Sequence, residues 1–93
     1  MKKTPGKKLA KLLGISPTKG MQAVMKAELI SAILEKIKKD KWTHAELAEK
    51  SGLPRSAVTG ILSGSLQRVT LDRILRLVET VGLIAEVKIK TAA

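Results

Sequence analysis

The chain has 93 residues and no cysteine, which excludes disulfide bonds and thiolate chemistry. This length fits one small domain with tails, and a 44% share of hydrophobic residues allows a folded core. Eighteen Lys and Arg residues against eight Asp and Glu residues give a net charge of +10. Such a charge predicts a polyanionic partner, either a nucleic acid or an acidic membrane surface.

Residues 1–20 carry six lysines and no acidic residue, together with two prolines and three glycines. This composition predicts a flexible basic N-terminal arm with one helical turn at residues 8–13. Two interpretations of the arm stay open. It is either a solvated tail that aids solubility, or a segment that contacts phosphates or a protein partner.

From residue 21 onward the sequence has a helical period. Apolar residues recur at steps of three and four over residues 21–40, and Leu29, Ile33 and Ile37 form the apolar stripe. Lysines near the end of this segment suit the negative end of a helix dipole. The pattern predicts a long helix over residues 21–40.

A second, shorter helix is expected to start after residue 43. Thr43 followed three positions later by Glu46 has the pattern of a capping box, so the helix would run from His44 to about residue 50. Gly52 follows, and glycine readily takes the left-handed conformation that ends a helix.

The third helix is marked by Pro54, which suits a first turn, and it would run to Ser63 and end at Gly64. Leu53 just before it is expected in the core. Thr70 can cap a fourth helix at residues 71–81, which Gly82 would end. The residues of this fourth helix expected to face inward are Leu71, Ile74, Leu75, Val78 and Val81.

The last segment changes to a period of two, which predicts a half-buried strand over residues 83–91. A single strand leaves its backbone groups without a partner in its own chain, so we expect it to pair with a second copy. In an antiparallel pair centred on Val87, Glu86 faces Lys88 of the other copy. The predicted dimer-interface residues are Leu83, Ala85, Glu86, Val87, Lys88 and Ile89.

Two helices joined by a glycine turn, the second exposed at its start, form the helix-turn-helix pattern. Residues 42–64, WTHAELAEKSGLPRSAVTGILSG, resemble the lambda-repressor-like family, also called Cro/Xre type. The matching residues are Thr43, Glu46, Leu47, Ala48, Gly52, Leu53, Arg55, Ser56, Val58, Ile61 and Gly64. The resemblance implies an all-α domain of the five-helix type at residues 21–82, with residues 83–93 as dimerisation strand and tail.

Three positions depart from the family pattern. Family members usually carry Gln where His44 stands, at a phosphate contact; histidine can donate there, or it can be an exposed residue without a special role. Pro54 replaces a Ser or Thr that touches phosphate in many members. Many members also pair a buried Arg with a Glu at the positions of Ile37 and Leu62, and losing both charges together avoids a stranded charge.

The outer face of the third helix carries the residues expected to read DNA bases. On a helix of 3.6 residues per turn, Arg55, Ser56, Thr59 and Gly60 share this face. Arg55 can grip guanine with two hydrogen bonds, and Gly60 lets the backbone approach closely. The residues expected to contact phosphates are Thr43, His44, Lys41, Gln67 and Arg68.

Aromatic content further favours double-stranded DNA as the partner. Single-strand binders and common RNA modules stack bases on aromatic rings, and this sequence has no Phe or Tyr and one Trp. No apolar run approaches the roughly 18 residues of a membrane span, and a helix at residues 7–13 is too short to bind a membrane surface alone, so no membrane partner is expected.

The sequence therefore predicts a repressor that binds an inverted-repeat operator as a homodimer. The ending TLDRILRLVETVGLIAEVKIK also resembles type II antitoxins of the host-inhibition-of-growth sort, which implies a small ribonuclease-type toxin as partner and autoregulation of the operon. A stand-alone phage- or plasmid-type regulator and a nonspecific architectural binder are the alternatives. Since the sequence shows no metal-ligand spacing, phosphate-binding glycine loop or nucleophile–base set, we expect neither an enzyme nor a cofactor. The expected location is the cytoplasm, close to the nucleoid.

Overall fold

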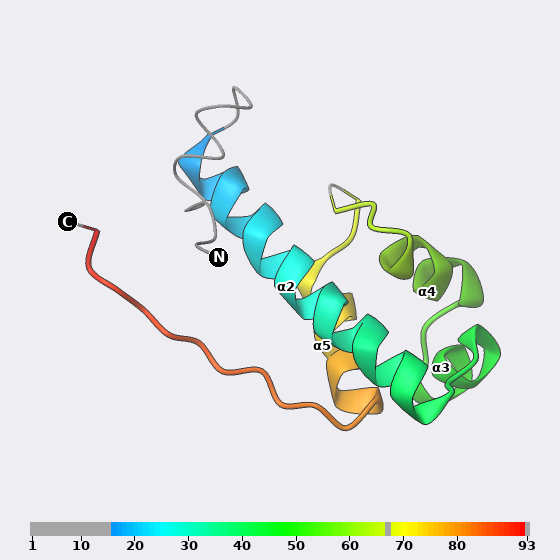
Figure 1. The fold of residues 1–93 in the computed structure, drawn as a ribbon. Coiled ribbons are helices and arrows are strands. Elements are labelled where there is room, and N and C mark those ends of the chain that lie inside the picture. Colours follow the sequence, from blue (N-terminus) through cyan, green and yellow to red (C-terminus); the bar gives the residue numbers. More distant parts are fainter. Residues whose placement is uncertain (1–15, 67, 93) are drawn as a thin grey trace.

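The computed structural model describes residues 16–66 and 68–92 of the chain, and these residues contain four helices. They are α2 (Pro17–Asp40), α3 (His44–Ser51), α4 (Arg55–Leu62) and α5 (Leu71–Thr80). In Figure 1 the long α2 runs across the molecule with α5 packed alongside, and α3 and α4 lie together on one side. The all-α prediction is confirmed for these residues, but they contain four helices where the resemblance implied a domain of five. The expected turn at residues 8–13 lies outside them.

Helix α2 begins at Pro17, four residues earlier than the period predicted. Ser16 caps it, because its side-chain oxygen accepts a hydrogen bond from the backbone N–H of Lys19 at 3.2 Å. Pro17 occupies the first turn, where the missing N–H of proline costs nothing. Residues 17–20 therefore belong to the helix, and the Ser-Pro pair marks its start.

The core is formed where the four helices meet. Fully buried side chains come from every helix, and the partly buried Leu29, Ile37 and Leu62 pack against them. Ile37 and Leu62 thus pack against the core as apolar residues, at the two positions where many family members pair a buried Arg with a Glu. The largest fully buried side chains are Ile33, Leu47, Ile61, Ile74, Leu77 and Val58.

The predicted inward face of α5 is confirmed for Ile74, Val78 and Val81 but not for Leu71 and Leu75. Leu77 is fully buried beside Ile74 and Val78, whereas Leu71 and Leu75 are 41% and 40% exposed. The apolar residues of α5 form an arc that is wider than its buried face, so the period alone left open which part of the arc faces the core. Packing against α2 and α3 selects the face that contains Leu77.

Residues 83–92 leave α5 as an extended segment with no assigned strand. Gly82, at φ 83°, ends the helix, and the N–H of Leu83 donates to the carbonyl of Val78 at 2.9 Å. Beyond Leu83 the segment runs clear of the helices (Figure 1), and the side chains of Val87 and Ile89 are 74% and 90% exposed. The half-buried strand is therefore not found in the single chain, since a strand needs a neighbour and the described residues supply none.

Candidate nucleic-acid interface

The start of α3 is fixed by a reciprocal pair of hydrogen bonds. The backbone N–H of Glu46 donates to the Thr43 hydroxyl at 3.1 Å, and the backbone N–H of Thr43 donates to the Glu46 carboxylate at 3.0 Å. The bond that the Thr43 backbone N–H donates to the carboxylate stabilises its charged form and lowers the pKa of Glu46, and the Thr43 side chain adds a smaller effect in the same direction. Gly52 ends the helix at φ 75°, as predicted, and turns the chain toward α4.

Helix α4 has two chemically distinct faces, and their assignment from the sequence is confirmed. Val58 and Ile61 are buried in the core, while Arg55, Ser56 and Thr59 are exposed. Gly60 is half-buried, with no atom within 4 Å of the place that a Cβ would occupy. The structure thus brings all four predicted base-reading residues to one side of a short, firmly anchored helix.

A contact between the two helices joins two of the predicted site residues. Nδ1 of His44, the first residue of α3, lies 3.2 Å from the hydroxyl oxygen of Thr59 on α4. His44 is half-buried and Thr59 is exposed. A predicted phosphate contact and a predicted base contact are therefore hydrogen-bonded to each other.

A profile of a helix-turn-helix domain matches residues 11–90, which is most of the chain. The chain belongs to the helix-turn-helix domain family. This is a family of DNA-binding proteins, in which the second helix of the motif is the recognition helix. No curated protein and no solved structure matched the chain closely enough to refine this assignment.

The remaining predicted phosphate contacts of this helix-turn-helix domain lie on either side of the motif. Lys41 is exposed at the end of α2 in the left-handed conformation, with φ 57°. Thr43 is exposed before α3, and Arg68 is exposed in the loop that joins α4 to α5. Gln67 lies outside the described residues.

Sequence reasoning missed Lys26, which ties this loop to α2. Its ammonium group donates to the carbonyls of Leu66 at 3.2 Å and Val69 at 2.7 Å. Position 26 is in phase with Ile30 and Ile33 on the buried face of α2. A lysine on an apolar stripe was the available signal, because such a residue needs a polar partner inside the fold.

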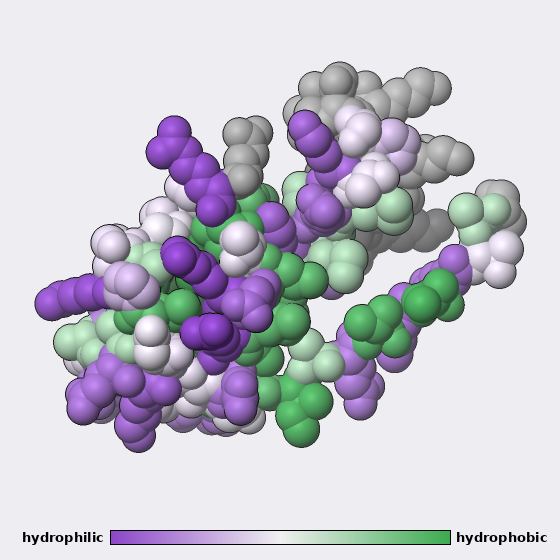
Figure 2. Space-filling model, turned by 180° about the vertical axis from the view of Figure 1, so that it is seen from behind, coloured by the Kyte–Doolittle hydropathy of each residue, from purple (hydrophilic) through white to green (hydrophobic). Residues whose placement is uncertain are grey.

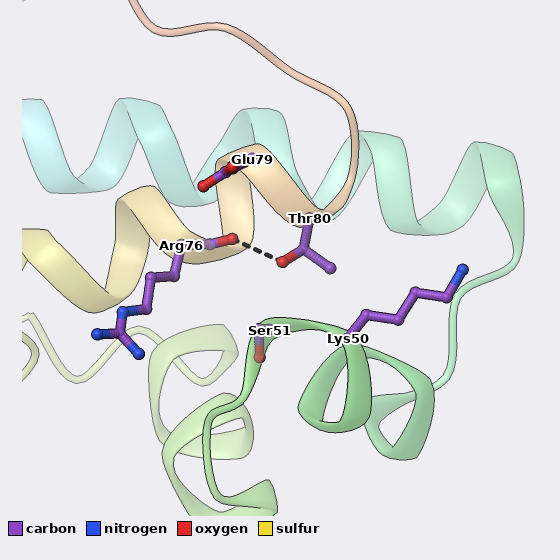
Figure 3. Close-up of a pocket in the computed structure, with 5 residues that line it drawn as sticks. All are labelled: Lys50, Ser51, Arg76, Glu79 and Thr80. Atoms are coloured by element: carbon purple, nitrogen blue, oxygen red, sulfur yellow. Dashed lines mark hydrogen bonds between the residues drawn. The ribbon is translucent and has the colours of Figure 1, made fainter.

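A shallow hollow between α3 and α5 is lined by Lys50, Ser51, Arg76, Glu79 and Thr80. In Figure 3 the charged ends of Lys50 and Arg76 point away from each other, and the Thr80 hydroxyl donates to the Arg76 carbonyl at 2.7 Å. These side chains do not converge on a ligand position.

Residues 16–66 and 68–92 hold neither a metal-binding cluster nor a membrane-spanning helix. This part of the chain contains no group of three or more His, Asp or Glu residues able to hold a metal ion. None of its helices is long and apolar enough to cross a bilayer.

Proposed function

We propose that the protein is a sequence-specific transcriptional repressor that places α4 in the major groove of double-stranded DNA. One observation carries the proposal: α4 buries Val58 and Ile61 while it keeps Arg55, Ser56 and Thr59 exposed. Helix-turn-helix proteins present the start of their second helix to base edges. The net charge of +10 supplies the attraction to phosphates that such binding needs.

The decisive experiment is selection of binding sites from a randomised DNA library, followed by affinity measurements on the selected site and on bulk DNA. Arg55→Ala should weaken the selected site by roughly 10- to 100-fold, the discrimination given by a bidentate arginine–guanine contact. Its effect on bulk DNA should be small. Arg73→Ala is the matched control, since Arg73 is equally exposed but lies on α5.

Two outcomes would contradict the proposal. Equal loss on both DNAs would make Arg55 a phosphate contact with no role in reading bases. If the unaltered protein selects no sequence at all, it is a nonspecific architectural binder.

The proposed repressor acts as a two-fold homodimer. Apolar surface is left uncovered on the single chain, both at Leu71 and Leu75 of α5 and at Val87 and Ile89 of the extended segment. Figure 2 shows hydrophobic side chains gathered on the face of the helical body beside that segment. Pairing of two segments about Val87 would satisfy their backbone groups and bury these residues. Such a dimer would place two copies of α4 on the two halves of an inverted repeat.

Charge reversal tests this pairing, because Glu86 would lie opposite Lys88 of the second copy. Glu86→Lys and Lys88→Glu should each weaken the dimer by placing like charges opposite each other, and the double variant should restore it. Sedimentation at micromolar concentration measures the outcome. A protein that stays monomeric, or a dimer that is indifferent to both single reversals, would rule the pairing out.

Within this function we propose the narrower role of an antitoxin that represses its own operon. The support is the likeness of residues 70–90 to the ending of host-inhibition-of-growth antitoxins. The test is co-expression with the neighbouring gene. A small ribonuclease that is retained by this protein and inactivated by it would support the role. If the neighbouring product is neither bound nor inhibited, the protein is a stand-alone regulator.

A further inference from the structure

The hydrogen bond between His44 and Thr59 spans the two helices of the helix-turn-helix motif. It joins the first residue of α3 to the middle of α4, at a distance of 3.2 Å between Nδ1 and the hydroxyl oxygen. Both residues lie at the surface where the two helices meet. The bond therefore lies at the point where a nucleic acid would contact both helices.

An imidazole ring has two nitrogens, and this contact uses one of them. Among the described residues, no hydrogen bond engages Nε2 of His44. When the ring proton is on Nε2, Nδ1 accepts a hydrogen bond from the Thr59 hydroxyl, and Nε2 can donate to a phosphate oxygen. One side chain can thus join the DNA backbone to Thr59.

The bond also restricts what Thr59 can offer to a base. A free threonine hydroxyl rotates and can either donate or accept a hydrogen bond. In the tautomer that lets Nε2 donate to a phosphate, Nδ1 is the acceptor, so the hydroxyl hydrogen of Thr59 points at the ring and its lone pairs face the groove. The hydroxyl then presents mainly one polarity to the groove, and base edges in the major groove differ in that polarity.

We propose that His44 is a specificity-determining residue that acts through Thr59. This inference rests on the proposed function, since it requires α4 to read base pairs. His44 holds the hydroxyl of Thr59 in one orientation, and its contact to phosphate locks the pair in place when DNA is bound. In this way a contact between the start of α3 and the DNA backbone sharpens the discrimination between bases by α4.

The test is binding-site selection with the full chain and four variants. The unaltered protein should show a preference of about tenfold at one base pair that Thr59→Val abolishes, as expected for a single base-edge contact. His44→Ala should abolish the same preference and leave those set by Arg55 intact. The double variant should show no further loss, because both substitutions remove one coupled unit.

His44→Asn is the discriminating control. The asparagine amide can reach the position of Nδ1, and hence Thr59, but it is too short to replace Nε2. This variant should keep a preference at the same base pair and lose affinity evenly for all sequences, as loss of a phosphate contact does. Circular dichroism should show an unchanged fold, since both positions are at the surface.

The inference is overturned if His44→Ala lowers affinity evenly while the preference at the Thr59 base pair survives. It is equally overturned if His44→Asn loses that preference as fully as His44→Ala does. A failure of the proposed function would look different, because the unaltered protein would then select no sequence at any position.

Discussion

The substitution Lys26→Met removes both hydrogen bonds that tie the α4–α5 loop to α2. In the structure the Lys26 ammonium donates to Leu66 O at 3.2 Å and to Val69 O at 2.7 Å in a partly buried position. Methionine has a similar unbranched stem but no donor, so packing is preserved while the two carbonyls lose their partner.

The expected loss of stability follows from these two bonds. A hydrogen bond to a charged group contributes about 1.5–3 kcal/mol. Removing the ammonium group from water to this partly buried position has a desolvation cost that methionine does not have, and this offsets part of the gain. We therefore expect a net loss of about 2 kcal/mol in the free energy of unfolding. For a domain of this size, that corresponds to a fall in Tm of roughly 8–16 °C.

Thermal and urea unfolding, followed by circular dichroism, measure this loss. Lys19→Met is the matched control, because Lys19 lies on the same helix with an exposed side chain. Its effect should stay within about 0.5 kcal/mol. If Lys26→Met is no more harmful than Lys19→Met, the two loop carbonyls are as well satisfied by water, and the reasoning is refuted. DNA affinity should also fall with Lys26→Met, since the loop carries Arg68.

Three further substitutions test single features of the site. Gly60→Ala should stabilise the fold by about 1 kcal/mol through helix propensity, since the protein leaves the Cβ position open. The same change should weaken DNA binding, and unchanged affinity would show that the α4 backbone does not approach the bases. Lys41→Gly should raise the free energy of unfolding by about 1 kcal/mol, and with it Tm, because glycine relieves the left-handed backbone at this position. It should also reduce the salt slope of DNA binding by about one charge, and an unaltered slope would remove Lys41 from the interface. Because folding lowers the pKa of Glu46, its carboxylate stabilises the fold at a pH above the ordinary pKa of a glutamate, and this stabilisation is lost as the pH falls through the lowered pKa. The Tm advantage of the unaltered protein over Glu46→Gln should therefore shrink from pH 7 to pH 3, and a gap that stays constant with pH would contradict the charge effect.

Sequence alone determined the features that depend on residues a few positions apart. The capping box of Thr43 and Glu46, the cap formed by Thr70 and the left-handed exits at Gly52 and Gly82 are present as predicted. The caps join a side chain to a backbone group in the same turn, and each exit joins backbone groups of one turn, so the local sequence holds all the information. The exposed face of α4 followed from the helical period, because its apolar and polar residues occupy separate arcs.

Tertiary packing decided what the period left open. On α5 the apolar residues form a broad arc, and only contact with α2 and α3 placed Leu77 inside and left Leu71 and Leu75 outside. The bond from Lys26 to Val69 joins residues 43 positions apart, and the bond between His44 and Thr59 crosses from one helix to the next. Such contacts depend on how the helices are placed in space, whereas the period of a helix fixes only the angles between its own side chains.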